Sequence, residues 1–507
     1  MASNYKTPGV YIEEKNAFPN SVVEVATAVP AFIGYTEYAV NGTKEIWKQP
    51  YRISSLADFH QHFGGAPDYT FAIAPPVAPA ASDFQSLGVG YALTQDGGNY
   101  MLYRSMRLFF DNGGGPCYIV AMGKYGDTID LNAFDEALSL LKREQEPTMI
   151  VIPDLMAAPQ HAVPAADIYT MQGRIIDHCG YTMQSRVAIL DVVDGWLRAD
   201  STATPIKNFR GGVTSDFLQY SAAYYPWVYS SVVSPSDVDF RNISEKGKSL
   251  IDILEKEVDD NFAKKFIDAD KQTSYKTEIA KIGTADAKTA TVVHNTLMVI
   301  SPAYISAMNE LRKKLNLLPP SGAMAGVYAR VDHSRGVWKA PANVTMASVI
   351  SPAVNLTSED QEDLNITLQG KSINAIRSFI GEGTLVWGAR TLDGNSQDWR
   401  YVNVRRTMIM LEQSVKAACK AYVFEPNDAN TWVGVKSMIN NFLTGKWKDG
   451  ALAGAKPDDA FDVQIGLGST MTANDILDGY MNVTVKVAIS RPAEFIVITF
   501  QQQMQKS

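Results

Sequence analysis

Three aspartates follow an apolar run near the middle of the chain, and carboxylates in such a position often do chemistry. The run Arg186–Asp191 predicts a β-strand, and Asp194 and Asp200 lie just beyond its end. In α/β proteins, ligand sites lie at the carboxyl ends of the strands. Asp191 and Asp194 could transfer protons in a cytoplasmic α/β enzyme with the charged segment 234–291 as a lid. They could instead cap helices or be solvated in loops, because no nucleophile lies beside them.

Other patterns that could bind a metal or a phosphate are incomplete. His60 and His62 are two residues apart, which on a strand would place both on one face, but no third ligand is nearby. The triplet Gly113–Gly115 precedes a predicted strand, whereas a phosphate-binding loop follows one. The three cysteines are far apart and form no Cys-x-x-Cys. The sequence therefore predicts no catalytic set, no cofactor and no metal site.

Composition limits the remaining function classes. A chain of 507 residues is too long for one hydrophobic core, and its 46% hydrophobic residues suit several folded domains. The net charge of −8 disfavours nucleic acid as a partner. The start of the chain has no basic and apolar secretion signal, and no stretch of about 20 apolar residues could span a bilayer. We expect folding in the cytoplasm and no membrane insertion.

The middle of the chain alternates strand-like and helix-like segments. Apolar runs predict strands at 117–122, 149–153, 186–191 and 227–233, with a helix between the first two. This alternation is typical of parallel strands with helical crossovers. Ser301 and Pro302 predict a helix start, and the segment 234–291 predicts an amphipathic helix with Ile251, Leu254, Val258, Phe262 and Phe266 on one face.

Both ends of the chain read as β-strands that follow Pro/Gly joints. Thr7-Pro8-Gly9 precedes an apolar segment, and Ser490-Arg491-Pro492 precedes a final strand that is apolar on both faces. Residues 481–489 alternate as a strand with one apolar face, after a predicted helix over 403–421. An extended end must find a sheet edge for its backbone groups, and that edge could belong to another copy of the chain.

Several motifs, in order along nearly the whole chain, resemble those of contractile tail sheath proteins from phages and phage-tail-like injection particles. The similarity begins with Thr7–Glu14 and Val25–Gly34. It continues through Phe109–Gly114, Pro319–Arg330 with Asp332, Arg335–Asn343, Trp387–Leu392, Tyr401–Arg406, Phe424–Asn427 and Pro492–Ile496. Each motif alone is weak, and their shared order makes the resemblance specific.

The resemblance implies a structural protein and not an enzyme. Sheath subunits of this family form stacked rings of six around an inner tube, and contraction drives that tube through a target envelope. The implied partners are other copies, the inner tube, the baseplate, terminal cap proteins and possible sheath paralogues. The implied particle is a virion tail, a bacteriocin or an extracellular injection system, assembled in the bacterial cytoplasm and then released.

The resemblance also implies a multidomain α/β and α+β fold whose conserved core is built from the N- and C-terminal regions. We expect residues 1–38 to form an N-terminal arm and first core strand, and 39–115 a loop-rich connector. An outer α/β domain would span 116–345, with the helical insertion 234–291. The C-terminal core would span 346–507, with an arm at 491–507.

The terminal arms are the expected working residues, because family members exchange strands between subunits. The expected strand-exchange residues are Val10, Tyr11, Ile12, Glu13, Phe495, Ile496, Val497, Ile498, Thr499 and Phe500, and the expected hinge residues are Pro8, Gly9, Ser490 and Pro492. Both segments could instead begin strands that pair locally. Lys416 and Lys420 share a helix face and could touch the tube, or that face could simply be solvated.

Overall fold

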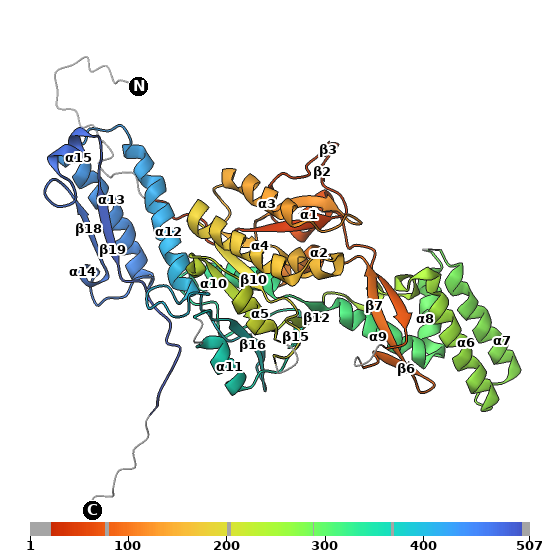
Figure 1. Cartoon of the computed structure of the whole chain (residues 1–507). Helices are drawn as coiled ribbons and strands as arrows, with labels where there is room; N and C mark the ends of the chain where they lie inside the picture. Colours follow the sequence, from red (N-terminus) through yellow and green to blue (C-terminus); the bar gives the residue numbers. More distant parts are fainter. Residues whose placement is uncertain (1–21, 77–80, 200–203, 287, 367–369, 499–507) are drawn as a thin grey trace, which may run out of the picture. The chain divides into compact units, whose positions relative to one another are not determined.

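The computed structural model describes residues 22–76, 81–199, 204–286, 288–366 and 370–498, and the chain divides into two compact units (Figure 1). The smaller unit comprises Met1–Val25 with Thr407–Arg491. The larger unit comprises Ala26–Arg406 with Pro492–Ser507. The domain boundaries expected from the sequence stay predictions.

A nine-stranded sheet forms the centre of the larger unit, in the order β14-β17-β16-β11-β10-β9-β1-β8-β4. Pairing is parallel from β16 to β8 and antiparallel at both edges. The strands span Val344–Thr345 (β14), Gly383–Val386 (β17), Asn374–Phe379 (β16), Ser221–Tyr225 (β11), Val187–Asp191 (β10), Met149–Val151 (β9), Pro30–Thr36 (β1), Cys117–Lys124 (β8) and Tyr51–Ile53 (β4). The predicted parallel α/β layer is confirmed, and its central strands are buried and mostly apolar, as parallel strands usually are.

One predicted parallel strand lies elsewhere. The run 227–233 contains β12 (Val228–Ser230), which pairs antiparallel with β13 (Leu317–Leu318) and β15 (Val349–Pro352) in a separate sheet. The parallel strand is β11, whose sequence Ser-Ala-Ala-Tyr-Tyr has few strongly apolar residues. Pro226 follows β11 directly and separates it from β12, because proline cannot donate to a ladder.

Helices cover the sheet in pairs. Helix α2 (Leu102–Asp111) packs with α10 (Ser321–Arg335), and α3 (Leu131–Leu140) packs with α4 (Ala165–Asp177). Helix α10 is buried over 321–329 and lies very close to α2, since a Cβ added at Gly322 would lie 2.7 Å from the Ser105 carbonyl oxygen. The motif beginning at Pro319 is therefore a close-packed central helix.

The charged insertion 234–291 folds as two α-helices where one was predicted, and a third helix begins at its end. They are α6 (Lys248–Ala263), α7 (Ala269–Ala280) and α8 (Ala290–Ile300), which gather near β6 and β7 in Figure 1. The predicted apolar face is wrong at its end, because Phe262 and Phe266 are exposed where Asp268 caps the start of a new helix. The predicted helix start at Ser301 is confirmed, since its hydroxyl accepts the Tyr304 N–H of α9 (Pro302–Leu315).

The remaining elements of the larger unit are short or peripheral. A three-stranded sheet holds β5 (Thr70–Ala74), β7 (Val89–Gly97) and β6 (Phe84–Ser86). A small hairpin joins β2 (Val40–Asn41) and β3 (Lys44–Glu45), and the other helices are α1 (Leu56–Phe63), α5 (Pro205–Gly212) and α11 (Ser358–Asn365).

The smaller unit is built on two helices and a two-stranded sheet. The unit division falls within α12 (Val402–Cys419), which confirms the helix predicted over 403–421. Helix α13 (Ala429–Lys448) packs on β18 (Phe461–Ile465), which pairs antiparallel with β19 (Val483–Val487). The strand predicted over 481–489 is thereby confirmed as β19. Two short helices, α14 (Pro457–Ala460) and α15 (Ala473–Leu477), complete the unit.

Candidate strand-exchange site

The aspartate that could have served an enzyme instead joins a strand end to a helix. Asp191 is buried at the end of β10, and its two carboxylate oxygens accept the backbone N–H and the hydroxyl of Ser321 at the start of α10. The adjoining cavity has a volume of only about 10 Å³, room for a single water. Asp194 is in a left-handed turn (φ +56°), and Asp200 lies outside the described residues. Asp191 is thus a structural cap with no space for a substrate.

Burial raises the pKa of Asp191 to about 7, although the bonds from Ser321 act in the opposite direction. The raised value means that the folded state favours the protonated carboxyl, so this contribution to stability is largest below about pH 4 and is lost as pH rises through about 7. We expect Asp191→Asn to raise the free energy of unfolding by about 1–3 kcal/mol at pH 8. Urea unfolding at pH 4 and pH 8 measures this, and a variant less stable at pH 8 would contradict it.

The two histidines lie on a helix, so the strand considered for them is absent. His60 and His62 belong to α1, where the first contacts the Tyr103 hydroxyl (3.1 Å) and the second the Val40 carbonyl (2.9 Å). Within the described part of the chain, no three His, Cys, Asp or Glu side chains are grouped as metal ligands. In the same residues, no helix has the length and apolar character needed to cross a membrane.

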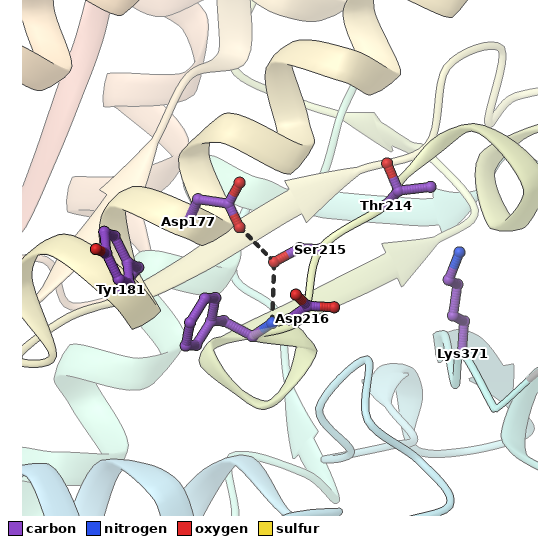
Figure 2. Close-up of a pocket in the computed structure, with 7 residues that line it drawn as sticks. Asp177, Tyr181, Thr214, Ser215, Asp216 and Lys371 are labelled. Carbon is purple, nitrogen blue, oxygen red and sulfur yellow. Dashed lines mark hydrogen bonds between the residues drawn. The ribbon is translucent and has the colours of Figure 1, made fainter.

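An open pocket of about 560 Å³ lies in the larger unit, and its polar groups are occupied locally (Figure 2). Ser215 donates to Asp177 (2.6 Å) and accepts the backbone N–H of Phe217 (3.0 Å). Lys371 lies apart from that pair in Figure 2 and donates to two backbone carbonyls, at 2.6 and 2.5 Å. Because these polar groups bond to nearby protein groups, we interpret the pocket as a hollow beside a tight turn and not as a ligand site.

The C-terminal segment exposes a run of large apolar side chains. Phe495, Ile496, Val497 and Ile498 are 67, 79, 88 and 70% exposed. Over 492–498 the chain pairs with no strand of the described residues, so the predicted final strand does not form within a single copy. Thr499 and Phe500 lie outside the described residues. Four adjacent apolar side chains in water are unfavourable, which indicates that another surface covers them.

A partly buried carboxylate anchors this segment immediately before the apolar run. Glu494 accepts hydrogen bonds from Arg390 Nη2 (2.6 Å) and Nε (3.0 Å), from the Tyr401 hydroxyl (2.9 Å) and from Asn365 Nδ2 (2.7 Å). The Arg390 side chain is buried, and its bonds hold the pKa of Glu494 below its usual range despite partial burial. Charged hydrogen bonds in such a setting are stronger than neutral ones. The arm therefore leaves the larger unit from a fixed point.

The sequence analysis did not predict a role for Glu494, although the residue lies in the motif Pro492–Ile496. A single carboxylate between Pro492 and an apolar run was the available signal. Its partners come from segments more than 90 residues away, and only the fold brings them together.

The smaller unit offers sheet edges to which a strand could be added. Ala488 donates its N–H to Ala460 next to β18, so the alternation of an antiparallel ladder points the N–H and C=O groups of Val483, Val485 and Val487 away from β18. Among the described residues, no third strand pairs with β18 or β19. A two-stranded sheet is marginal alone, and an added strand would stabilise it.

The N-terminal residues chosen from the sequence cannot be compared with the structure. Pro8, Gly9, Val10, Tyr11, Ile12 and Glu13 lie outside the described residues. The chain is described from residue 22, where Glu24 pairs with Lys446 (2.7 Å) and the Val25 N–H donates to Ser414 (3.1 Å), all within the smaller unit. Glu24 and Val25 are thus attached to α13 and α12.

The expected hinge and tube-facing residues have defined positions. Ser490 donates its hydroxyl to the Gly450 carbonyl (2.9 Å), and the division between the units falls just before Pro492. Lys416 and Lys420 are exposed, at the end of α12 and in the turn that follows it. Their roles stay predictions.

Comparison with known proteins gives consistent matches. The model of the phage tail sheath protein central domain matches residues 215–392, and that of the phage tail sheath C-terminal domain matches 395–503. The tail sheath protein of Vibrio phage KVP40 is 28% identical over 153 residues, which cover 30% of this chain and 22% of that protein. The matched region therefore spans less than a quarter of that relative.

Solved structures match over nearly the full length. The sheath complex of the extracellular contractile injection system PVC, in its contracted state, is 28% identical with a TM-score of 0.58 and covers 99% of both chains. The helical sheath of the anti-feeding prophage, also contracted, is 27% identical with a TM-score of 0.59 and covers 99% of this chain and 100% of that one. The two domain models together span more than half of the 507 residues.

Proposed function

The chain belongs to the phage tail sheath family and is a structural sheath subunit, and we propose that its copies polymerise as stacked hexameric rings around an inner tube. Shortening of this polymer would drive the tube through the envelope of a target cell. Such a role needs strong links between copies and no catalytic centre. It replaces the alternative of an α/β enzyme that uses Asp191 and Asp194 under a charged lid.

The observation that carries this proposal is the exposed apolar segment Phe495–Ile498 beside its anchor, Glu494. In our proposal this arm adds to the open edge of β18 or β19 in a neighbouring copy, which is β-augmentation. Each added backbone hydrogen bond contributes about 0.5–1.5 kcal/mol net, so one arm is a modest link. Many arms in a closed lattice hold together by multivalency.

During contraction, the arm would let a copy move without dissociating. The anchor keeps Glu494 in its own copy while the strand stays paired in the next, so rotation between copies is taken up directly after Glu494. Ser490 and Pro492, which precede the anchor, would be hinges on its other side. Residues Pro8 and Gly9 would serve the N-terminal arm, Val10–Glu13, in the same way. Lys416 and Lys420 would contact the tube through exposed ion pairs, which are weak, about 0–1 kcal/mol each, and suit a grip that must release.

Other partners and the cellular setting follow from the relatives. The anti-feeding prophage relatives occur in structures of a baseplate and of a helical sheath. We infer that this chain also meets a baseplate, an inner tube, a terminal cap and possible sheath paralogues. Assembly would take place in the bacterial cytoplasm, followed by release of the particle as a virion tail or an extracellular injection system. The core would comprise 1–38 and 346–507, and 39–115 and 116–345 would lie outside it.

Electron microscopy of the purified full chain tests the proposal. We expect rings or helical tubes above a critical concentration, because every copy carries both a donor arm and an open sheet. Co-expression with the inner tube protein should lengthen these tubes by providing a template. A chain that remains a monomer at all concentrations, with and without the tube protein, would contradict the proposal.

A further inference from the structure

A phenylalanine in the smaller unit is both strained and fully exposed. Phe424 lies in the loop between α12 and α13, with φ at +72° and a side chain that is 102% exposed. The left-handed region is unfavourable for a bulky residue, and glycine or asparagine usually occupies it. A folded single copy gains nothing from an aromatic side chain in water at such a position.

The surrounding loop holds this conformation in place. Asn427 donates through Nδ2 to the Tyr480 carbonyl (2.9 Å) and accepts from Trp432 Nε1 (2.7 Å). The Asp428 carboxylate accepts the first free N–H groups of α13 at 3.0 Å, and the Glu425 N–H donates to the Tyr422 carbonyl. A strained residue fixed by its neighbours points to a function rather than to a defect.

Further exposed apolar side chains lie in the loop between α12 and α13 and in the segment around Tyr480, which Asn427 joins to that loop. Val423 precedes Phe424 and is exposed, as are Leu477 at the end of α15 and Tyr480, whose carbonyl Asn427 binds. We call these four residues the α12–α13 knob. A rigid aromatic group with exposed apolar neighbours has the character of an interface hot spot, because little side-chain entropy is lost on binding.

The position of the knob indicates what covers it. Tyr480 lies three residues before β19, so the knob continues directly into the sheet to which the proposed function adds a neighbour's strand. All four residues also lie within 395–503, the part matched by the sheath C-terminal domain. A neighbour that donates a strand to β19 brings its own surface beside the knob.

We propose that the α12–α13 knob is a contact between copies of this chain, with the Phe424 ring inserted into the surface of the copy that adds its strand to this sheet. The inference rests on the proposed polymerisation. A contact of one patch with a different patch on the next copy is heterologous, and contacts of this kind build rings and helices. The knob would thereby be a second contact between the two copies, beside the added strand.

Paired asparagine substitutions separate assembly from folding. Phe424→Asn should leave the melting temperature of the monomer unchanged or raise it by up to about 4 °C, because asparagine tolerates the left-handed region. It should raise the critical concentration for polymerisation at least about tenfold, the effect of a modest hot spot. The matched control is Leu87→Asn, which changes another exposed apolar residue in a left-handed turn (φ +52°). The control should polymerise as the unchanged chain does.

Two outcomes would overturn the proposal. A Phe424→Asn chain that polymerises normally shows that the ring is not a contact between copies, and a lower monomer melting temperature shows a folding role. A photoreactive phenylalanine analogue at position 424 should form covalent dimers of this chain in polymers, and crosslinks to the tube protein alone would also overturn it. Failure of the proposed strand exchange is distinct, since chains lacking residues 495–507 would then polymerise while Phe424→Asn still weakened assembly.

Discussion

Removal of residues 495–507 is expected to abolish polymerisation while the monomer stays folded. The described part of this segment, Phe495–Ile498, is exposed and pairs with no described strand, so its loss removes no buried contact of the single copy. It removes the donor strand, whose several backbone hydrogen bonds at about 0.5–1.5 kcal/mol each decide whether neighbours stay linked. Sedimentation and electron microscopy measure the polymer, and circular dichroism and thermal melting measure the fold.

Proline substitutions give a control that keeps the apolar character of the arm. In an added strand, alternate residues direct their N–H groups to the acceptor edge. Val497→Pro removes one N–H of one alternate set, and Ile496→Pro with Ile498→Pro removes two N–H groups of the other set, so the two variants should differ in polymer yield. Equal, full polymerisation by both would show that the arm binds through side chains alone and would contradict strand addition.

The anchor is tested by Glu494→Gln, which keeps the shape of the side chain but removes its charge. The bonds from Arg390 then lose their ionic character, and this buried guanidinium lacks its counter-charge. Polymers of this variant should form but dissociate at lower salt and urea concentrations than those of the unchanged chain. The depressed pKa of Glu494 also means that anchoring is present above its usual range and is lost as pH falls through the lower folded-state value.

The sequence correctly predicted the elements that have a local signal, such as alternating apolar residues, an apolar helix face or a helix cap. The alternation in β19, the apolar face of α12 and the Ser301 cap are local signals, and all three elements formed where expected. Strand β11 was missed because its small and aromatic residues become a central strand only when neighbours bury them. The single helix predicted for the insertion became two, because the Asp268 cap starts a second helix and overrides the apolar spacing at Phe262 and Phe266.

The apolar run Phe495–Ile498 was recognisable from the sequence as a segment in need of a partner, and the structure shows it exposed. Its role in strand exchange stays a prediction. The anchor at Glu494 depends on Asn365, Arg390 and Tyr401, which no local pattern connects. The strain at Phe424 is a backbone property, and sequence carries no signal for it.

A buried ion pair within the larger unit links three segments that are far apart in the sequence. Arg406 of α12 makes a bidentate contact with Asp332 of α10, at 2.9 and 2.5 Å, and donates to the Thr27 carbonyl (2.9 Å). The Thr27 hydroxyl also donates to Asp332 (2.6 Å), and the guanidinium lies 4.6 Å from the centre of the Tyr328 ring. Both charged side chains are buried, so each depends on the other for compensation.

Asp332→Leu is therefore expected to lower the free energy of unfolding by about 3–5 kcal/mol, because it leaves the Arg406 guanidinium buried without a counter-charge. The double variant Asp332→Leu with Arg406→Met should cost much less, since two apolar groups of similar size need no compensation. Urea unfolding of the unchanged chain, the two single variants and the double variant measures the coupling energy between the two residues. The slope of the free energy of unfolding against urea concentration should be the same for all four chains. Additive losses would show that the two residues act independently. A double variant close to the unchanged chain would show that this pair selects the packing of α10, α12 and the N-terminal segment without adding net stability.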